Sequence, residues 1–401
     1  MQLESVTTVP SPNNDHRVRL VAQVSYDDKA FAPEPYWYDV PEGMAEFLST
    51  SGNPWLVCLV PLAVTLGEPL RIRKPVDRVL YDNVEELMLI WKCWYPNLHV
   101  VPVEAPVVDV PGHPAGSKTV AFFSGGVDSF FTVLRHSDPA TGAKDTCIDD
   151  LLCVWGFDIP LRRPDEFQRL RSTLQNAASD LGRELVDVAT NLKITRLREA
   201  EWGRLYHGCA LASVALALER RYSKVLIASS HGYKDLQPWG SHPLTDPLLS
   251  TSQAKVIHDG SAFDRVEKTA LVAKSDVAMR SLHVCYRIWS DKNCGNCNKC
   301  YRTMTTLALL GALDRCTTFP PGAFDVRRVA KVYSPDESDR SFFREIRAFA
   351  LRQRRFDVVR AVDRSFRYST WMNRLLPVLR SLKTDRFVWR VERALLAGFN
   401  A

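Results

Sequence analysis

The chain has 401 residues, of which 46% are hydrophobic and 24% charged, and its formal net charge is +6 at pH 7. This length and composition predict two to three domains with substantial hydrophobic cores. The longest apolar run, residues 54–66, contains Pro61 and is too short to span a bilayer, and the first residues lack the pattern of a secretory signal. These features exclude a transmembrane helix, and we expect a cytoplasmic protein with no membrane partner.

Residues 1–116 are predicted to form a separate N-terminal α+β module. The pattern predicts two strands, Val18–Val24 and Trp55–Val60, and one helix, Asn83–Trp91. The Pro- and Gly-rich stretch Pro106–Pro114 is interpreted as the linker to the next domain. The module has no catalytic constellation. Its consecutive aromatic residues are typical of a core or of a homodimer surface: Tyr36, Trp37 and Tyr38.

The sequence SGGVDS at Ser124–Ser129 lies between a predicted strand, Thr119–Phe123, and a predicted helix that begins near Phe130. Glycines let backbone N–H groups approach an anion, and a helix N-terminus adds unsatisfied donors and partial positive charge. Serine hydroxyls can donate further hydrogen bonds, and Asp128 can orient the turn or hold Mg²⁺. An isolated Gly-Gly pair would indicate only a tight turn, but the whole string in this context predicts a nucleotide phosphate site. Its predicted contacts are Ser124, Gly125, Gly126, Val127, Asp128 and Ser129.

The central region, residues 117–320, alternates strand and helix patterns, which predicts an α/β fold with a doubly wound parallel sheet. After the first strand, the predicted strands are Asp150–Gly156, Glu184–Val188 and Lys224–Ser229, and the predicted helices are Asp165–Leu181 and His207–Leu218. Ligands of such sheets lie at the carboxyl ends of the strands. That rule places Ser124, Gly156, Asp158, Ser229, Ser230 and His231 along one edge. Among them we expect Gly156, Asp158 and Ser229 to contact the nucleotide.

A long loop at residues 229–251 carries candidate substrate-handling residues, because long loops inside compact domains are commonly functional. We predict that His231 and Asp235 act on the substrate. Four further candidates are Lys234, Trp239, His242 and Asp246. The His and Asp residues of this loop could bind a second metal ion, or they could only cap turns and a helix. Three lysines could stabilise a leaving pyrophosphate or be solvated: Lys255, Lys268 and Lys274.

Four cysteines occur within sixteen residues: Cys285, Cys294, Cys297 and Cys300. Two of the gaps are C-x2-C, and Gly295 fits the turn of a metal knuckle, so the pattern favours a structural, tetrahedral Zn²⁺ site. A cubane iron–sulfur cluster also takes four thiolates and is the main alternative.

The C-terminal region, residues 321–401, contains 18 Lys and Arg against 9 Asp and Glu, and its pattern predicts helices. Arginines interleaved with aromatic residues can bind a nucleic acid through its phosphates. The alternative is a helical extension that packs its apolar face on the protein body while the arginine side chains reach solvent.

The SGGVDS string resembles the PP-loop of N-type ATP pyrophosphatases. Together with C-x8-C-G-x-C-x2-C and the nearby Arg302, it resembles the 7-cyano-7-deazaguanine synthase (QueC) family over roughly residues 118–313. The resemblance implies an adenine nucleotide alpha hydrolase-like (HUP) fold. The chain departs from that family after the second strand, where it reads WGFDIP, and in the substrate loop, so the resemblance implies the ATP chemistry more strongly than a 7-deazapurine substrate.

The resemblance implies a ligase that uses ATP and Mg²⁺, adenylates a small-molecule carboxylate or amide oxygen, and releases pyrophosphate. Ammonia would then displace AMP to form a C–N bond. We predict catalytic roles for Ser124, Asp128, Ser129, His231 and Asp235. Two alternatives remain open: a PP-loop sulfurtransferase that acts on tRNA, for which Cys153 and Cys209 are the nearest thiols, and a nucleotide-binding interaction protein without catalysis.

Overall fold

The computed structural model describes residues 1–12, 16–112, 117–137 and 147–381, with side chains up to residue 377. These residues form two compact units. Unit 1 comprises residues 1–124, 132–230 and 238–261, and unit 2 comprises residues 125–131, 231–237 and 262–401. The division therefore differs from the predicted boundaries at residues 116 and 320. The end of the predicted linker, residues 113–114, and the end of the predicted C-terminal extension, residues 382–401, lie outside the described residues.

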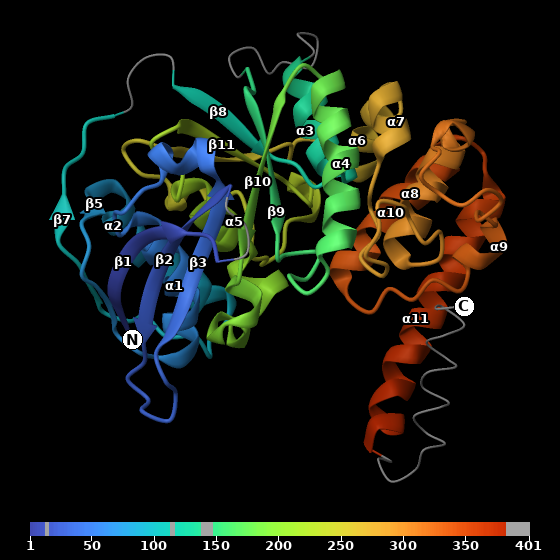
Figure 1. Cartoon of the computed structure of the whole chain (residues 1–401). Helices are drawn as coiled ribbons and strands as arrows, with labels where there is room; N and C mark the ends of the chain where they lie inside the picture. Colours follow the sequence, from blue (N-terminus) through green and yellow to red (C-terminus); the bar gives the residue numbers. More distant parts are fainter. Residues whose placement is uncertain (13–15, 113–116, 138–146, 382–401) are drawn as a thin grey trace. The chain divides into compact units, whose positions relative to one another are not determined.

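Unit 1 is built on a ten-stranded sheet, and Figure 1 labels β1 to β3 and β8 to β11 among its strands. Across the sheet the order is β12-β11-β8-β9-β10-β3-β2-β1-β4-β6. The strands are β1 (Gln2–Pro10), β2 (Arg17–Ser25), β3 (Glu34–Pro41), β4 (Leu70–Ile72), β6 (Val103–Glu104), β8 (Lys118–Phe122), β9 (Asp150–Trp155), β10 (Glu184–Thr190), β11 (Tyr222–Ala228) and β12 (Lys255–Asp259). A separate parallel pair joins β5 (Val76–Asp77) to β7 (Val107–Val108), and β7 lies within the predicted linker.

The parallel half of the sheet confirms the predicted α/β class. Strands β8 to β12 are parallel, and relative to their order in the chain they lie third, second, first, fourth, fifth across the sheet. Such an order reverses direction between the first and fourth strands, here β8 and β11, and ligands of doubly wound sheets bind at the carboxyl ends beside that reversal. The strand β12 was not predicted from the sequence.

The N-terminal strands extend this same sheet. Strand β3 pairs antiparallel with β10, where Tyr38 faces Thr190 and Asp39 faces Ala189. The side chains of Tyr36 and Tyr38 are fully buried, which confirms their interpretation as core residues. Residues 1–116 thus share a sheet with the central region instead of closing a module of their own.

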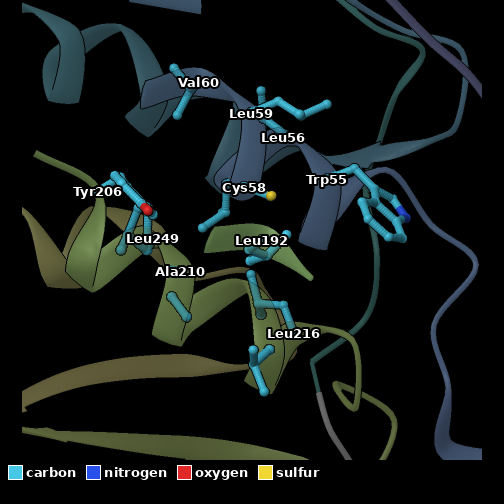
Figure 2. Packing of buried hydrophobic residues seen from close by; sticks show 14 of the residues in the cluster. Trp55, Leu56, Cys58, Leu59, Val60, Leu192, Tyr206, Ala210, Leu216 and Leu249 are labelled. Carbon is cyan, nitrogen blue, oxygen red and sulfur yellow. The ribbon is translucent and has the colours of Figure 1, made fainter. Parts of the chain in front are cut away.

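The prediction of a strand at Trp55–Val60 is wrong, because this apolar run lies inside the helix α1 (Asn53–Leu66). Pro54 occupies the first turn, where its missing N–H costs nothing, and Gly67 ends the helix in the left-handed conformation with φ 72°. A fully apolar run cannot be assigned by periodicity, since a helix buried on all sides shows none. Figure 2 shows Cys58 on the side of α1 that lies towards Ala210 and Leu216.

The other helices of unit 1 follow the prediction, with α2 longer than expected. They are α2 (Arg78–Trp94), α4 (Pro164–Asp180) and α5 (His207–Leu216), with α3 (Val127–Ser137) passing from unit 2 into unit 1. Helix α2 begins earlier than the sequence pattern indicated, because the Asp77 carboxylate caps it by accepting the Val79 N–H.

Unit 2 is helical beyond residue 262, as predicted for the C-terminal region. Its helices are α6 (Arg265–Val272), α7 (Asp276–Ser281), α8 (Asn298–Leu309), α9 (Val326–Val329), α10 (Glu337–Arg352) and α11 (Phe356–Ser381). Within the described parts of the chain, no helix is long and apolar enough to span a membrane.

Candidate anion site and metal centre

The glycine-rich loop has the geometry that its sequence predicts. Gly125 lies in the left-handed region with φ 76°, and helix α3 starts two residues later at Val127. The Gly125 carbonyl accepts the His283 N–H at 2.7 Å, which fixes the loop within unit 2. The buried Ser129 hydroxyl donates to the Gly126 carbonyl at 3.1 Å. Glycine is needed at position 125 because an L side chain is strained at this φ.

Asp128 forms an ion pair with the first turn of α6. Its Oδ2 lies 2.7 Å from Nη2 of Arg265, and its Oδ1 lies 3.6 Å from Nζ of Lys268. A capping box between Asp264 and Glu267 starts α6 at Arg265, and a spacing of three residues then puts both cations on one helix face. Asp128 therefore orients these cations, and its predicted roles in orienting the turn or holding Mg²⁺ stay predictions.

Arg302 is a third buried cation in unit 2. It is 7% exposed, and its guanidinium stacks 3.9 Å from the ring centre of Phe342. Among the described residues no carboxylate forms an ion pair with Arg302, and its Nε has no hydrogen-bond partner. Burial, followed by the charge of Arg265, lowers the pKa of Arg302 to about 10. We call Arg265, Lys268 and Arg302 the cation cluster.

One face of α10 packs on the cation cluster and on His231. Ser338, Phe342 and Glu345 follow one another at helical spacing. The Glu345 carboxylate accepts the backbone N–H of Arg265 at 2.9 Å, and burial raises the pKa of Glu345 to about 7. Arg265 lies 4.9 Å from the centre of the Phe342 ring. The helix thus supplies an aromatic platform for two of the three cations.

His231 lies near the cation cluster in unit 2, and its side chain is buried and uncharged. Its ring stacks on Phe342 with centroids 4.8 Å apart, and its Nε2 lies 3.1 Å from the Ser338 hydroxyl. Burial lowers the pKa of His231 to about 4, and the charges of Arg265 and Arg302 act in the same direction. At neutral pH the imidazole therefore carries no charge, and it can donate one hydrogen bond and accept another.

Asp235, the other predicted catalytic residue of this loop, is half-buried and lies 3.3 Å from Nη2 of Arg344. Lys234 is exposed. Nothing in these contacts ties Asp235 directly to the cation cluster, and its catalytic role stays a prediction.

In unit 1, several predicted nucleotide contacts follow the carboxyl ends of the parallel strands. Ser124 is exposed after β8, and Asp158 is exposed in the turn after β9. Gly156 in that turn has φ 107°, and a Cβ there would lie 2.1 Å from the Thr190 carbonyl oxygen, so only glycine fits. The fully buried Ser229 donates its N–H to the carbonyl of Asp259 at 2.7 Å.

Asp259, at the end of β12, holds the second half of α3 in unit 1. Its carboxylate accepts hydrogen bonds from Thr132 at 2.8 Å and Arg135 at 2.9 Å, and it lies 3.1 Å from Nε2 of His136. These partners, led by His136, lower the pKa of Asp259 against the effect of burial. The sequence analysis did not find this residue.

Two other candidates of the long loop have structural roles in unit 1. Asp246 is fully buried, where it accepts the Ser241 hydroxyl at 2.6 Å and lies 2.7 Å from Nδ1 of His258. The His242 ring packs edge-on against Trp94, with centroids 4.8 Å apart. Among the residues the structure describes, the four-cysteine group is the only cluster of three or more His, Cys, Asp or Glu that could hold a metal. The contacts thus favour the structural alternative over a second metal.

The four predicted cysteines converge in unit 2. Their sulfur atoms all lie within 4.8 Å of one another, a spacing that can hold a metal ion such as zinc. Backbone N–H groups of Arg287, Asn296 and Cys300 point at the sulfurs of Cys285, Cys294 and Cys297, at 3.3 to 3.4 Å. Gly295 has φ 66°, as expected for the knuckle turn. Cys297 is also the N-cap of α8, the helix that carries Arg302.

Three residues of the site were not predicted from the sequence: Arg265, Phe342 and Glu345. A signal for Arg265 was present, since the pattern Asp264-x-x-Glu267 is a capping box that puts residues 265 and 268 on one face. Phe342 and Glu345 lie on a helix whose packing partner no local pattern reveals.

No family model matches this chain, and neither a curated protein nor a solved structure matches it.

Proposed function

We propose that this chain is an AMP-forming, ATP-dependent enzyme whose glycine-rich loop and cation cluster bind the β- and γ-phosphates of ATP. The observation that carries the proposal is Arg302, a buried guanidinium with no carboxylate partner among the described residues, beside Arg265 and Lys268. Buried charges are normally paired, because an unpaired one is costly to desolvate. A polyanion would compensate this excess of positive charge.

The loop supports a phosphate ligand in the same unit. Gly125 and Gly126 carry no side chain that would block an anion, and α3 starts directly after them with its unsatisfied N–H groups. Asp128 holds Arg265 at 2.7 Å. In unit 1, the reversal of strand order between β8 and β11 is the usual ligand position in such sheets. A nucleotide-binding fold of the HUP type agrees with all three features.

In the proposed reaction an acceptor oxygen, from a carboxylate or an amide, forms a bond to the α-phosphorus of ATP. The bond between that phosphorus and the bridging oxygen breaks, and pyrophosphate leaves with the electron pair. The cation cluster stabilises the charge that develops on pyrophosphate. Ammonia then attacks the acceptor carbon, the carbon–oxygen bond breaks, and AMP leaves. Mg²⁺ would enter with the phosphates of ATP, and the neutral His231 would orient groups instead of acting as a charged acid.

For the metal centre we propose structural zinc. In a tetrahedron with Zn–S bonds of about 2.3 Å, neighbouring sulfurs are about 3.8 Å apart. The sulfurs of Cys294 and Cys300 are 3.7 Å apart. A cubane cluster binds each thiolate through a different iron and therefore spreads the sulfurs further. Four thiolates leave no open position, so the metal would shape α8 and its Arg302 instead of binding substrate.

The sulfurtransferase alternative is less favoured. It needs a reactive thiol, but Cys153 and Cys209 are buried, and burial raises the pKa of both thiols. A thiol with a raised pKa supplies little thiolate nucleophile at neutral pH.

The test uses ATP labelled in the α-phosphate, Mg²⁺, ammonium and a panel of small carboxylates. We expect labelled AMP with equal pyrophosphate, and at least a hundredfold loss in Lys268→Met. The matched control is Lys274→Met. Lys274 was also named from the sequence for the leaving pyrophosphate, but it is exposed and lies outside the cation cluster, so this variant should keep full activity. Release of ADP and phosphate, or equal activity in both variants, would contradict the proposal.

A further inference from the structure

Helix α11 has a stripe of cationic and aromatic side chains along its exposed face. Its members are spaced by three or four residues: Phe356, Arg360, Arg364, Arg367, Trp371 and Arg374. At 100° per residue these positions fall within an arc of about 80°, and they extend for about 27 Å along the helix. We call this set the α11 stripe.

The opposite face of α11 is apolar and buried in unit 2. It includes Val358, Val362, Met372 and Leu376, each at most 4% exposed. Helix α11 therefore packs on the rest of unit 2 through this apolar face, and the α11 stripe takes no part in that packing. The two aromatic members of the stripe, Phe356 and Trp371, are each 52% exposed.

The arginines of the stripe have no ion pair among the described residues. The helix has only two acidic side chains in this part, and both are already paired. Asp357 pairs with Arg355 at 2.7 Å, and Asp363 pairs with Arg347 at 2.7 Å. Four like charges remain aligned on one face, which is unfavourable for an isolated helix. Their arrangement matches a partner with regularly repeated negative charge.

We propose that the α11 stripe binds single-stranded nucleic acid. Guanidinium groups make bidentate hydrogen bonds to phosphates, and exposed aromatic rings stack on unpaired bases without sequence preference. A membrane surface fits less well, because a helix that lies on a bilayer exposes its apolar face to lipid, whereas the apolar face of α11 is buried. The stripe is separate in sequence from the glycine-rich loop and the cation cluster, so this binding does not depend on the proposed catalysis.

Binding is measured by fluorescence anisotropy of the full chain with labelled 20-nucleotide oligouridylate and oligothymidylate, which distinguish RNA from DNA. Neutralising about four phosphates predicts a slope of about −3 in log affinity against log salt concentration. In Arg364→Glu/Arg367→Glu we expect at least tenfold weaker binding and a slope reduced by about half. In Trp371→Ala we expect about tenfold weaker binding with the slope unchanged.

The matched control is Arg73→Glu/Arg198→Glu, which changes two exposed arginines of unit 1 and shifts the net charge equally. It should retain affinity within about twofold, and circular dichroism should show that all variants fold. Equal losses in the control and the stripe variants would overturn the proposal, since they indicate only a net-charge effect. Binding to anionic phosphatidylserine vesicles but not to either oligonucleotide would also overturn it.

Discussion

Replacing Arg302 by Met should stabilise the ligand-free protein and weaken pyrophosphate binding. Burial holds the pKa of Arg302 near 10, against 12.5 in water. This difference of about 2.5 units corresponds to about 3 kcal/mol for keeping the guanidinium charged in the folded state. At pH 8, below both pKa values, the folded protein bears this whole cost. Met removes the charge and fills similar volume, but it loses the stacking on Phe342, which contributes about 1 to 2 kcal/mol.

The net expectation is that Arg302→Met raises the free energy of unfolding by about 1 to 2 kcal/mol, as found when buried charges are replaced by apolar side chains. Charged hydrogen bonds contribute about 1.5 to 3 kcal/mol each, so the affinity for pyrophosphate should fall about 10- to 150-fold. Urea unfolding followed by circular dichroism measures the first quantity, and titration calorimetry with magnesium pyrophosphate measures the second.

The control is Arg344→Met on α10, because Arg344 is exposed and its ion pairs with Asp235 and Glu337 are solvated. It should change both quantities little. If Arg302→Met instead destabilises the protein by more than about 1 kcal/mol and leaves pyrophosphate affinity intact, Arg302 is a structural residue and the reasoning for the anion site fails.

Three further predictions concern the metal, the pH dependence and the fold. Removing the metal with a chelator should weaken pyrophosphate binding about as much as Arg302→Met, because Cys297 starts the helix that holds Arg302; unchanged binding would separate the two sites. Between pH 4 and 6.5 the unfolded chain protonates His231 and the folded protein does not, so this group makes stability rise with pH by up to about 3 kcal/mol. Glu345, whose pKa is raised, acts in the opposite direction, so the measurement is the difference between wild type and His231→Gln, which should lose this rise. Gly156→Ala should unfold unit 1. The control is Gly182→Ala, because Gly182 also has a positive φ but nothing lies within 4 Å of the added Cβ; thermal unfolding should show a loss of stability of only about 1 kcal/mol.

Local patterns predicted the parts of the fold that local physics determines. The strands β8 to β11 are short apolar runs bounded by turn residues, and the cysteine spacing alone brought four thiols together. The prediction of α1 as a strand failed because a helix enclosed on all sides shows no amphipathic period. The pairing of β3 with β10 could not be predicted, because it joins residues far apart in the chain.

The sequence named the glycine-rich loop and single residues such as Lys268 and Arg302, but it did not indicate which of them lie together. Asp128 was found from the motif, but its partner Arg265 is 137 positions further along the chain, and no local pattern connects the two. The same holds for His231, which was predicted as a catalytic group from its place after a strand. Its uncharged state arises from burial against Phe342 and from two nearby arginines, which only the three-dimensional arrangement reveals.

Helix α8 links the four-cysteine group of unit 2 to the proposed anion site, so the proposed metal would have a function beyond stability. Cys297 caps α8, Cys300 completes the four-thiolate group in its first turn, and Arg302 follows within the next turn. A rotation of about 100° per residue fixes the direction of Arg302 once the cysteines are held. Without the metal, repulsion between clustered thiolates would loosen this turn, and the buried guanidinium would lose its position on Phe342. In the proposed function, the closed thiolate site would act on phosphate binding through geometry, since a metal held by four thiolates has no free coordination position.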